Sequence, residues 1–471
     1  MEKREQGLSA SQLTMMALGT VIGGSFFLGS SVAIHAAGPS IIISYIIGGI
    51  LIYFILFALS EMTVANPGAG SFRAFASEAF GGGMGFVVGW VYWTGMVLAM
   101  SSEATAVSIL IREWYPGVSI SIMGSLIIIG VTLLNLLGAD KLSKLESGLA
   151  LLKVLAIIAF IIMAALIITG LITGISAVGA GEITREPLMP GGIKGIAGSM
   201  LIVIFAYAGF EIIGLAASEA KNPRETVPKA IKYTIFSLVG LYIISAAAIL
   251  PLVPTANLNE SVSPMVAALD RWGIGWAGTA INIVLITAIL STMLAAMFGL
   301  GRMIRSLAEE NLAPIWMKDK REVPYRGILF SGLAMMIGLG FGLLFPRVYL
   351  FLISSGGFAL LFTYAVILAS HIRFRKKHGC PPEGKCQMPW YPYSSWIALI
   401  CMIVVMLSMP LIKGQASGLV AGIIIIAFYS VSYFIFRSFI FKRNPDRLKA
   451  NFSTEFSKEL TTKKDTKDTK H

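Results

Sequence analysis

The sequence predicts an all-α polytopic membrane protein with 12 transmembrane helices, on two observations. Apolar residues make up 56% of the 471 residues and charged residues only 13%, whereas about a quarter of the residues in soluble proteins are charged. The apolar residues also fall into stretches of about 20 residues, the length of a helix that crosses a bilayer. Together these observations exclude a soluble secreted, fibrous or disordered protein.

Twelve apolar stretches are long enough to cross a membrane. They are 13–34, 40–65, 84–111, 119–138, 147–172, 194–217, 230–253, 274–300, 327–345, 348–371, 394–412 and 416–440. We expect the first to be retained rather than cleaved as a signal peptide, because Glu2 and Glu5 accompany the basic residues before it. The predicted organisation is an N-tail (1–12), one transmembrane domain (13–440) and a basic C-tail (441–471) whose composition predicts disorder.

The basic residues give the predicted orientation. If the N-terminus is cytoplasmic and the spans alternate, 30 of the 37 Lys and Arg residues lie in cytoplasmic segments and 6 in external ones, with Lys153 inside a span. The positive-inside rule predicts this asymmetry for an even number of spans with both termini in the cytoplasm. The net charge of +12 is therefore a signal of topology in a cell-membrane protein, and nucleic-acid binding has no support from it.

The first apolar stretch contains four glycines at membrane depth, Gly19, Gly23, Gly24 and Gly29. One interpretation is a face of small residues that packs against another helix. The other is a break in the helix, which membrane proteins tolerate only where the backbone lines a cavity. The freed N–H and C=O groups of a break could bind a zwitterion.

The sixth stretch contains a second such feature, the run from Phe205 to Gly214, with Glu211 two residues after Gly209. If the helix restarts near Gly209, Glu211 lies in its first turn, where the helix dipole favours a negative charge. Paired interruptions in corresponding spans of two halves indicate the binding site of a secondary transporter. We therefore predict inverted repeats over about 13–172 and 194–371, followed by two extra helices over about 394–440.

Charged residues inside the other spans need partners, because each is costly in a membrane. Lys153, in the fifth span, faces either the bundle interior or, by snorkelling, the cytoplasmic headgroups. Glu103, in the third span, either forms a structural hydrogen bond between helices or contacts substrate. His35 is interpreted as structural, and the groups at inner span ends as anchors or gate contacts: Glu61, Arg302, Arg305 and His371.

Cysteine and histidine give no catalytic or metal-binding pattern. Cys380 and Cys386 share one cytoplasmic loop and are interpreted as ordinary loop residues, with a regulatory thiol pair as the alternative. The four histidines are scattered at 35, 371, 378 and 471, and the sequence suggests no buried pairing of histidine with carboxylate. We therefore predict that the protein is not an enzyme and binds no metal.

Five ordered motifs resemble the amino acid permeases of the amino acid–polyamine–organocation superfamily, and the similar branch is the bacterial amino acid transporter family. They are Gly19–Ser30 with Ala37-Gly38-Pro39; Ser60-Glu61-Met62 with 67–72; Gly85–Trp93; Glu219-Ala220-Lys221-Asn222-Pro223; and Arg302–Ala308 with Leu312-Ala313-Pro314. The resemblance covers nearly all of residues 10–440. It implies a leucine-transporter-type (LeuT-type) fold of five plus five inverted helices with two more appended.

The resemblance also implies a substrate site at the two interruptions. It assigns the substrate carboxylate to backbone amides of Gly23, Gly24 and Ser25, and the substrate ammonium to carbonyls near Val21, Ile22 and Phe205. Phe205 is also the implied aromatic gate. The rest of the expected substrate-binding set is Ala206, Tyr207, Ala208, Gly209 and Glu103.

Lys153 falls where proton-driven relatives have a lysine, so the resemblance implies a role in proton coupling. Its implied partners are a carbonyl near Gly19 or Thr20 and a hydroxyl of the eighth span, Thr287 or Ser291; Glu211 completes the expected set. Ser25 replaces the last glycine of the family's usual Gly-x-Gly, and Ala208 replaces an amide side chain. Both departures favour a small or apolar neutral substrate.

These observations predict import of a neutral amino acid across the cell membrane by proton-coupled alternating access. The amino acid and the lipid bilayer are the expected partners, nucleic acid is not, and protons are the only expected coupling ion, with no cofactor. The alternatives are an amino acid/product antiporter, a cationic amino acid or other amine as substrate, a membrane-embedded enzyme, and a receptor that binds without transport.

Overall fold

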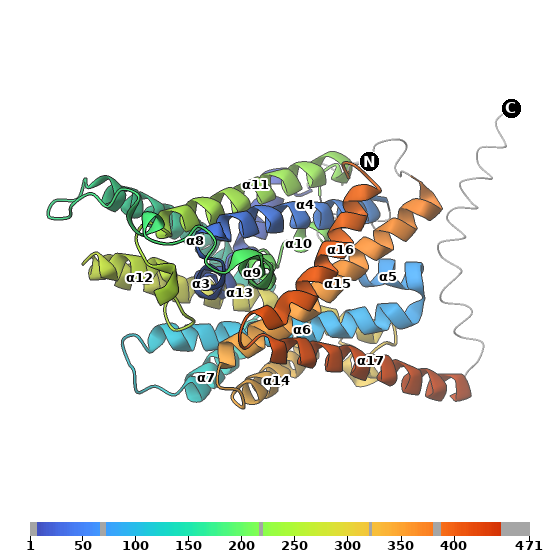
Figure 1. Ribbon diagram of the computed structural model, residues 1–471. Helices are drawn as coiled ribbons and strands as arrows, with labels where there is room; N and C mark the ends of the chain where they lie inside the picture. The colour runs from blue at the N-terminus through green and yellow to red at the C-terminus, as the bar shows by residue number, and fades with distance from the viewer. Residues whose placement is uncertain (1–6, 66–71, 216–219, 320–322, 380–387, 444–471) are drawn as a thin grey trace.

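The protein is described by a computed structural model over residues 7–65, 72–215, 220–319, 323–379 and 388–443. Within these ranges the regular structure is helical, apart from one isolated β-bridge between Leu8 and Ala220. Figure 1 shows the short helix α12 (Pro264–Arg271) at one end of the bundle and the short helix α5 (Phe72–Phe80) at the other. These two ends of the bundle are called the α12 end, or α12 side, and the α5 end, or α5 side.

Ten helices form most of the bundle. They are α4 (Ile41–Ala65), α6 (Gly82–Ile111), α7 (Ile120–Asn135), α8 (Ala139–Thr169), α11 (Pro223–Ile249), α13 (Gly275–Glu309), α14 (Tyr325–Gly342), α15 (Val348–His378), α16 (Tyr393–Ser408) and α17 (Ala416–Arg443). A helix satisfies its own backbone polar groups, which lipid requires. Nine helical stretches of the described residues are long and apolar enough to cross a membrane, and α7 and one further helix are shorter apolar ones.

The first predicted span is divided into α1 (Ala10–Val21), α2 (Gly24–Phe27) and α3 (Gly29–Ala37). A capping box on Ser9 and Gln12 starts α1. Ile22 and Gly23 are extended, with φ of −74° and −143°, so the helix is interrupted between Val21 and Gly24. The predicted break in the first span is confirmed, and the glycines there do more than provide a small packing face.

The sixth predicted span is divided into α9 (Gly192–Ala206) and α10 (Ile212–Leu215). Gly209, between them, has a φ of +105°, a conformation that other residues rarely adopt. The predicted interruption is therefore confirmed. The position of Glu211 needs a correction: α10 begins at Ile212, so Glu211 precedes the helix rather than lying in its first turn. The turn between the two helices spans residues 207–211, so the helix restarts later than the position of Gly209 predicts.

Several helices extend beyond the predicted apolar stretches. Most of the stretch 147–172 lies in α8, which begins at Ala139 and ends at Thr169, and most of the stretch 274–300 lies in α13, which continues to Glu309. Helical hydrogen bonds continue where the chain leaves lipid, whereas hydropathy marks only the lipid-embedded part. The predictions for the far C-tail and for Cys380 and Cys386 concern residues outside the described ranges.

The interrupted helices lie in the interior of the bundle. α1 packs against α8, α11 and α13, and α10 packs against α1. The hydroxyl of Thr20, at the end of α1, donates to the carbonyl of Gly209 at 3.3 Å. A Cβ added to Gly209 would lie 3.0 Å from the Thr20 carbonyl oxygen. This close approach brings the two interruptions, 189 residues apart in the chain, to one place.

Candidate functional site

A cavity of about 430 Å³ lies beside the two interruptions. Its lining follows α13 from Thr292 to Glu309, a distance of about 26 Å at 1.5 Å per residue. Because Glu309 is exposed, the cavity reaches the surface at the α5 end of the bundle. Its body is mostly apolar, with Met96, Ala99, Met100, Ala295, Ala296 and Leu360 among the lining residues.

The structure brings most of the predicted site residues to this cavity. The lining includes Thr20, Val21, Gly23, Ser25, Glu103, Phe205, Ala208, Gly209 and Glu211. It does not include Gly19, Ile22, Gly24, Lys153, Ala206, Tyr207, Thr287 or Ser291. Tyr207 is turned toward α4, where its hydroxyl donates to the Tyr45 carbonyl at 3.2 Å. Residues of both interruptions thus line the cavity, whereas several of their neighbours in sequence do not.

Lys153 lies fully buried behind the first interruption and not at the headgroups. Its Nζ donates to the Gly19 carbonyl at 2.7 Å and to the Thr292 hydroxyl at 2.8 Å. The Thr292 hydroxyl in turn lies 3.1 Å from the Ile22 carbonyl, at the break. One ammonium therefore joins α8 to α1 and, through Thr292, to α13.

The hydroxyl partner of Lys153 corrects the sequence prediction. Thr287 and Ser291 were the expected partners, but the contact is made by Thr292. The Thr287 hydroxyl instead donates within its own helix, to the Val284 carbonyl at 2.8 Å. Successive residues on a helix point about 100° apart, so an error of one position selects a different face. The carbonyl expected near Gly19 or Thr20 is that of Gly19.

Glu103 contacts the main chain of the first interruption. Its Oε2 accepts a hydrogen bond from the Gly24 amide at 2.7 Å, and the side chain is 3% exposed. This amide is one of those that the resemblance assigns to the substrate carboxylate. In this structure the protein's own carboxylate satisfies it. A substrate carboxylate therefore either displaces Glu103 or uses other amides of the break.

Glu211 holds the second interruption in place. Its Oε2 accepts from the Gly209 amide at 3.0 Å and from the Tyr364 hydroxyl at 3.4 Å, and its Oε1 accepts from the Tyr92 hydroxyl at 3.0 Å. Tyr92 lies on α6 and Tyr364 on α15, so this carboxylate joins the turn between α9 and α10 to two further helices. Sequence reasoning missed both tyrosines, although Tyr92 belongs to one of the five motifs.

The α5 end of the cavity is lined by charged groups. Arg73 of α5 lines the cavity and pairs with Glu310, which follows α13. Arg302, Arg305 and Glu309 of α13 also line this end. Arg302 and Arg305, interpreted from the sequence as anchors or gate contacts, thus lie at the lining of the cavity.

The cavity is closed toward α12. Phe26 of α2 stacks on Tyr242 of α11 with ring centroids 3.9 Å apart. The Tyr242 hydroxyl donates to the Ala206 carbonyl at 3.0 Å, and the Tyr349 hydroxyl to the Gly24 carbonyl at 3.2 Å. These contacts join both interruptions to α11 and α15 on the side away from the opening.

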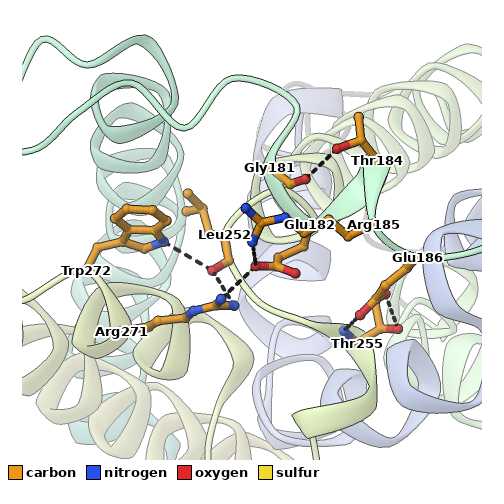
Figure 2. A network of polar contacts seen from close by, with 9 residues as sticks. All are labelled: Gly181, Glu182, Thr184, Arg185, Glu186, Leu252, Thr255, Arg271 and Trp272. Atoms are coloured by element: carbon orange, nitrogen blue, oxygen red, sulfur yellow. Dashed lines mark hydrogen bonds and ion pairs between the residues drawn. The ribbon is translucent and has the colours of Figure 1, made fainter.

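A polar network closes the bundle further out on the α12 side (Figure 2). Glu182 accepts from Arg271 at 2.6 Å and from Arg185 at 3.2 Å. Glu186 accepts from the backbone amide and the hydroxyl of Thr255, at 2.7 and 2.6 Å. The network ties the segment before α9 to the segment between α11 and α13.

One buried pair contradicts the sequence analysis. His371 and Glu61 are both buried, and their Nε2 and Oε2 atoms lie 2.7 Å apart. Glu61 also accepts from the Met388 amide at 2.7 Å. The expectation of no buried histidine–carboxylate pair is therefore wrong. Neither residue of the pair lines the cavity. Among the described residues, no cluster of three metal-ligating side chains occurs.

The chain is similar in sequence to known amino acid permeases. A family model described as amino acid permease matches residues 12–450. The gamma-aminobutyric acid permease of Bacillus subtilis is 33% identical over 436 residues, which cover 91% of this chain and 93% of that protein. The aromatic amino acid transport protein AroP of Escherichia coli K12 is 32% identical, over 88% of this chain and 92% of that protein.

A solved structure shares the arrangement of helices. It is a manganese transporter of Eremococcus coleocola, solved in complex with an aromatic bis-isothiourea substituted compound. The TM-score is 0.53, with 12% identity over 88% of this chain and 94% of that one. At this identity the similarity concerns the fold alone.

Proposed function

We propose, from the premise that this chain belongs to the amino acid permease family, that it imports a neutral amino acid by proton-coupled alternating access. Its relatives are permeases, so it is a multi-pass membrane transporter rather than an enzyme. We propose three specific points: a neutral amino acid as the substrate, the proton as the coupling ion, and import as the direction of transport.

One observation carries the proposal: two helices are interrupted at the same place, and a cavity of about 430 Å³ lies beside both interruptions. Unwound backbone inside a membrane supplies N–H and C=O groups that no helix uses, and these groups suit the two ends of an amino acid. The break residues Val21, Gly23, Ser25, Phe205 and Gly209 line the cavity.

The proposed topology has twelve spans, with both termini in the cytoplasm of a cell-membrane protein. α1 to α3 together form the first span, and α9 with α10 the sixth, which places the interruptions five spans apart. Five plus five inverted helices, with α16 and α17 appended, account for that spacing. In this orientation the α5 end is cytoplasmic, so the described cavity opens inward.

Lys153 is the proposed proton carrier. When charged, its ammonium holds Gly19 of α1 and Thr292 of α13 together. A neutral amine donates less strongly, and loss of the charge would loosen α1 from α13. One charge that moves down about 100 mV supplies about 2.3 kcal/mol, which corresponds to roughly fiftyfold accumulation.

The apolar lining favours a neutral substrate. Relatives are named for gamma-aminobutyric acid and for aromatic amino acids, compounds without net charge at neutral pH. Ala208, Ala295 and Ala296 leave room for an apolar side chain. Two of the carboxylates that line the cavity, Glu103 and Glu211, lie beside the interruptions and support the second candidate, a cationic amino acid or amine.

A panel of ligands tests the substrate class. Purified protein is heated with each of the twenty amino acids and with gamma-aminobutyric acid. A ligand that binds the folded state raises its stability. A rise in melting temperature with neutral amino acids alone therefore supports the proposal. Stabilisation by lysine, arginine or a simple amine alone would select the cationic candidate.

Uptake into proteoliposomes tests the coupling. Empty vesicles with an imposed pH gradient should concentrate the stabilising amino acid, and Lys153→Gln should bind it but fail to concentrate it. Uptake only into vesicles preloaded with a second amino acid identifies an antiporter. Concentrative uptake by Lys153→Gln at the wild-type rate would remove Lys153 from the mechanism.

A further inference from the structure

A second cavity, of about 380 Å³, lies outside the transport site. It is formed where α5 meets the last turns of α15 and the end of α4. Its lining contains the apolar side chains of Met62, Phe75 and Phe374 together with four charged ones, Glu78, Arg373, Lys376 and Lys377. An apolar cavity with a basic rim suits an amphiphile that carries a negative charge.

The cavity lies at the depth of the lipid headgroups. From Val348, where α15 begins, to Ser370, which lines the cavity, the helix rises about 33 Å at 1.5 Å per residue. The hydrocarbon core of a bilayer is about 30 Å thick. Ser370 therefore lies near the boundary of the hydrocarbon, and Arg373, Lys376 and Lys377 extend into the headgroup layer of the α5 side.

The lining of this cavity carries three basic side chains and one acidic side chain. The Arg373 guanidinium is fixed by the Ala79 carbonyl at 2.6 Å and lies over the Phe80 ring at 4.4 Å. Lys377 pairs with Glu78 at 3.3 Å. Lys376 is exposed and has no ion-pair partner among the described residues. The rim therefore carries an excess of positive charge.

The lining of the cavity includes one buried hydroxyl group, that of Ser370. Ser370 is 1% exposed, and its hydroxyl has no hydrogen-bond partner among the described residues. Buried hydroxyl groups are rarely left without a partner. A ligand that reaches Ser370 would give its hydroxyl a hydrogen-bond partner.

We propose that this cavity binds an anionic phospholipid of the cytoplasmic leaflet, with the phosphate at Arg373 and Lys376 and an acyl chain against Phe75 and Phe374. Positive clusters at this depth attract anionic lipids at about 1 kcal/mol per cation, roughly fivefold in binding. The occupant is a lipid because both apolar and basic side chains line the cavity.

The bound lipid acts on the transport cavity through α5, which lines both cavities. α5 separates the two cavities: Phe75, Glu78 and Ala79 line the lipid cavity, whereas Phe72 and Arg73 line the transport cavity. Arg73 pairs with Glu310 after α13. A lipid that holds α5 against α15 therefore stabilises the lining of the inward opening, without any contact to the transported molecule.

Native mass spectrometry of the full chain, purified from vesicles of phosphatidylglycerol and phosphatidylcholine, tests the binding. Wild-type protein should retain phosphatidylglycerol preferentially. Lys376→Glu should reduce this retention at least fivefold, and Lys232→Glu should leave it unchanged. Lys232 is a matched control because it is also an exposed lysine, in the first half of α11, and lies outside the cavity lining.

A second variant tests the cavity without a change in charge. Ala79→Trp fills the cavity beside Phe75, so it should also abolish preferential retention while the melting temperature shows that the protein is folded. Equal losses in Lys376→Glu and Lys232→Glu would mean only general attraction to an anionic surface, and would overturn the site. Displacement of the lipid by millimolar inorganic phosphate would identify a phosphate site instead of a lipid site. None of these readouts requires transport, so the result is independent of the proposed substrate.

Discussion

The Thr292 hydroxyl connects Lys153 to the interrupted first helix. It lies 2.8 Å from the lysine Nζ and 3.1 Å from the Ile22 carbonyl. Thr292→Val keeps the shape of the side chain and removes both hydrogen bonds. Hydrogen bonds to charged groups contribute about 1.5–3 kcal/mol, so we expect proton-driven uptake into proteoliposomes to fall at least tenfold.

Thr287 provides the matched control for this change. Its hydroxyl donates only to the Val284 carbonyl of its own helix, so Thr287→Val should transport like the wild type. Thr292→Ser keeps the hydroxyl and should recover most of the lost uptake. If the two valine variants transport equally well, the Thr292 contact has no part in coupling.

Asp270, outside the spans at the end of α12, gives a pH-dependent prediction for stability. Burial raises the pKa of Asp270, and the pKa of Glu113 is raised by its own burial and by the nearby Asp270 carboxylate. Above the folded pKa the charged aspartate therefore costs folding free energy. Asp270→Asn should raise the melting temperature at neutral pH. As the pH falls through the folded pKa, the aspartate takes up a proton and the advantage should disappear; a difference that is the same at every pH would refute this assignment.

The residues of the site could be predicted to different extents. Lys153 was placed in the interior because an isolated charge in a long apolar run needs partners. The choice of Thr292 over Ser291 depends on the rotation of α13 about its axis, which one sequence does not fix. The contact between Glu103 and Gly24 spans 79 residues of chain. It could not be predicted because several amides of the break were equally plausible partners.

The interrupted sixth helix depends on a conformation that only glycine adopts easily. Gly209 has a φ of +105°, and an added Cβ would lie 3.0 Å from the Thr20 carbonyl oxygen. Gly209→Ala should therefore strain the turn between α9 and α10 by about 1–3 kcal/mol. We expect the ligand-induced rise in melting temperature to be lost even where the variant folds.

Gly240 is the matched control at the level of elements. It lies inside α11, and an added Cβ would meet nothing within 4 Å. Gly240→Ala should stabilise the protein by up to about 1 kcal/mol, because alanine favours a helix more than glycine does. Equal ligand responses in the two alanine variants would mean that the Gly209 turn does not shape the site.

The elements themselves were predicted where apolar residues are continuous. The long apolar helices and both interruptions follow from hydropathy and from glycine at membrane depth. The short helices α5 and α12 were not predicted, because each is shorter than ten residues and lacks the apolar length that marks a span. α5 nevertheless lines both cavities, so a short amphipathic helix was the main omission near the site.

For the whole molecule, the long-range pairs were beyond sequence reasoning. Glu61 and His371 are 310 residues apart and meet only because α4 and α15 pack together. The network around Glu182 likewise joins segments 89 residues apart. Such pairs depend on how complete helices pack, and the pattern of a single helix does not contain this information.

The proposed alternating access requires that the α12 side opens, and the network of Figure 2 opposes this opening. Arg271 donates to Glu182 at 2.6 Å, across the two segments that must separate. Glu182→Ala removes the contact from the closed form alone. Glu182 is buried but the Arg271 side chain is 37% exposed, so we expect a shift of about 1 kcal/mol toward the outward-open form, roughly fivefold in population. Arg185→Ala is the control, since Arg185 is 73% exposed and contacts Glu182 from the same short segment.

Thiol labelling from outside measures this shift. Ser25 lines the transport cavity and is 4% exposed, so Ser25→Cys, in a chain whose native cysteines are serine, reports when the cavity opens outward. A membrane-impermeant reagent added to sealed vesicles should label Ser25→Cys about five times faster in combination with Glu182→Ala than alone or with Arg185→Ala. Saturating substrate from inside should slow all three by holding the inward form. An unchanged rate with Glu182→Ala would mean that the aromatic contacts of Phe26 and Tyr242 alone keep the outer side closed.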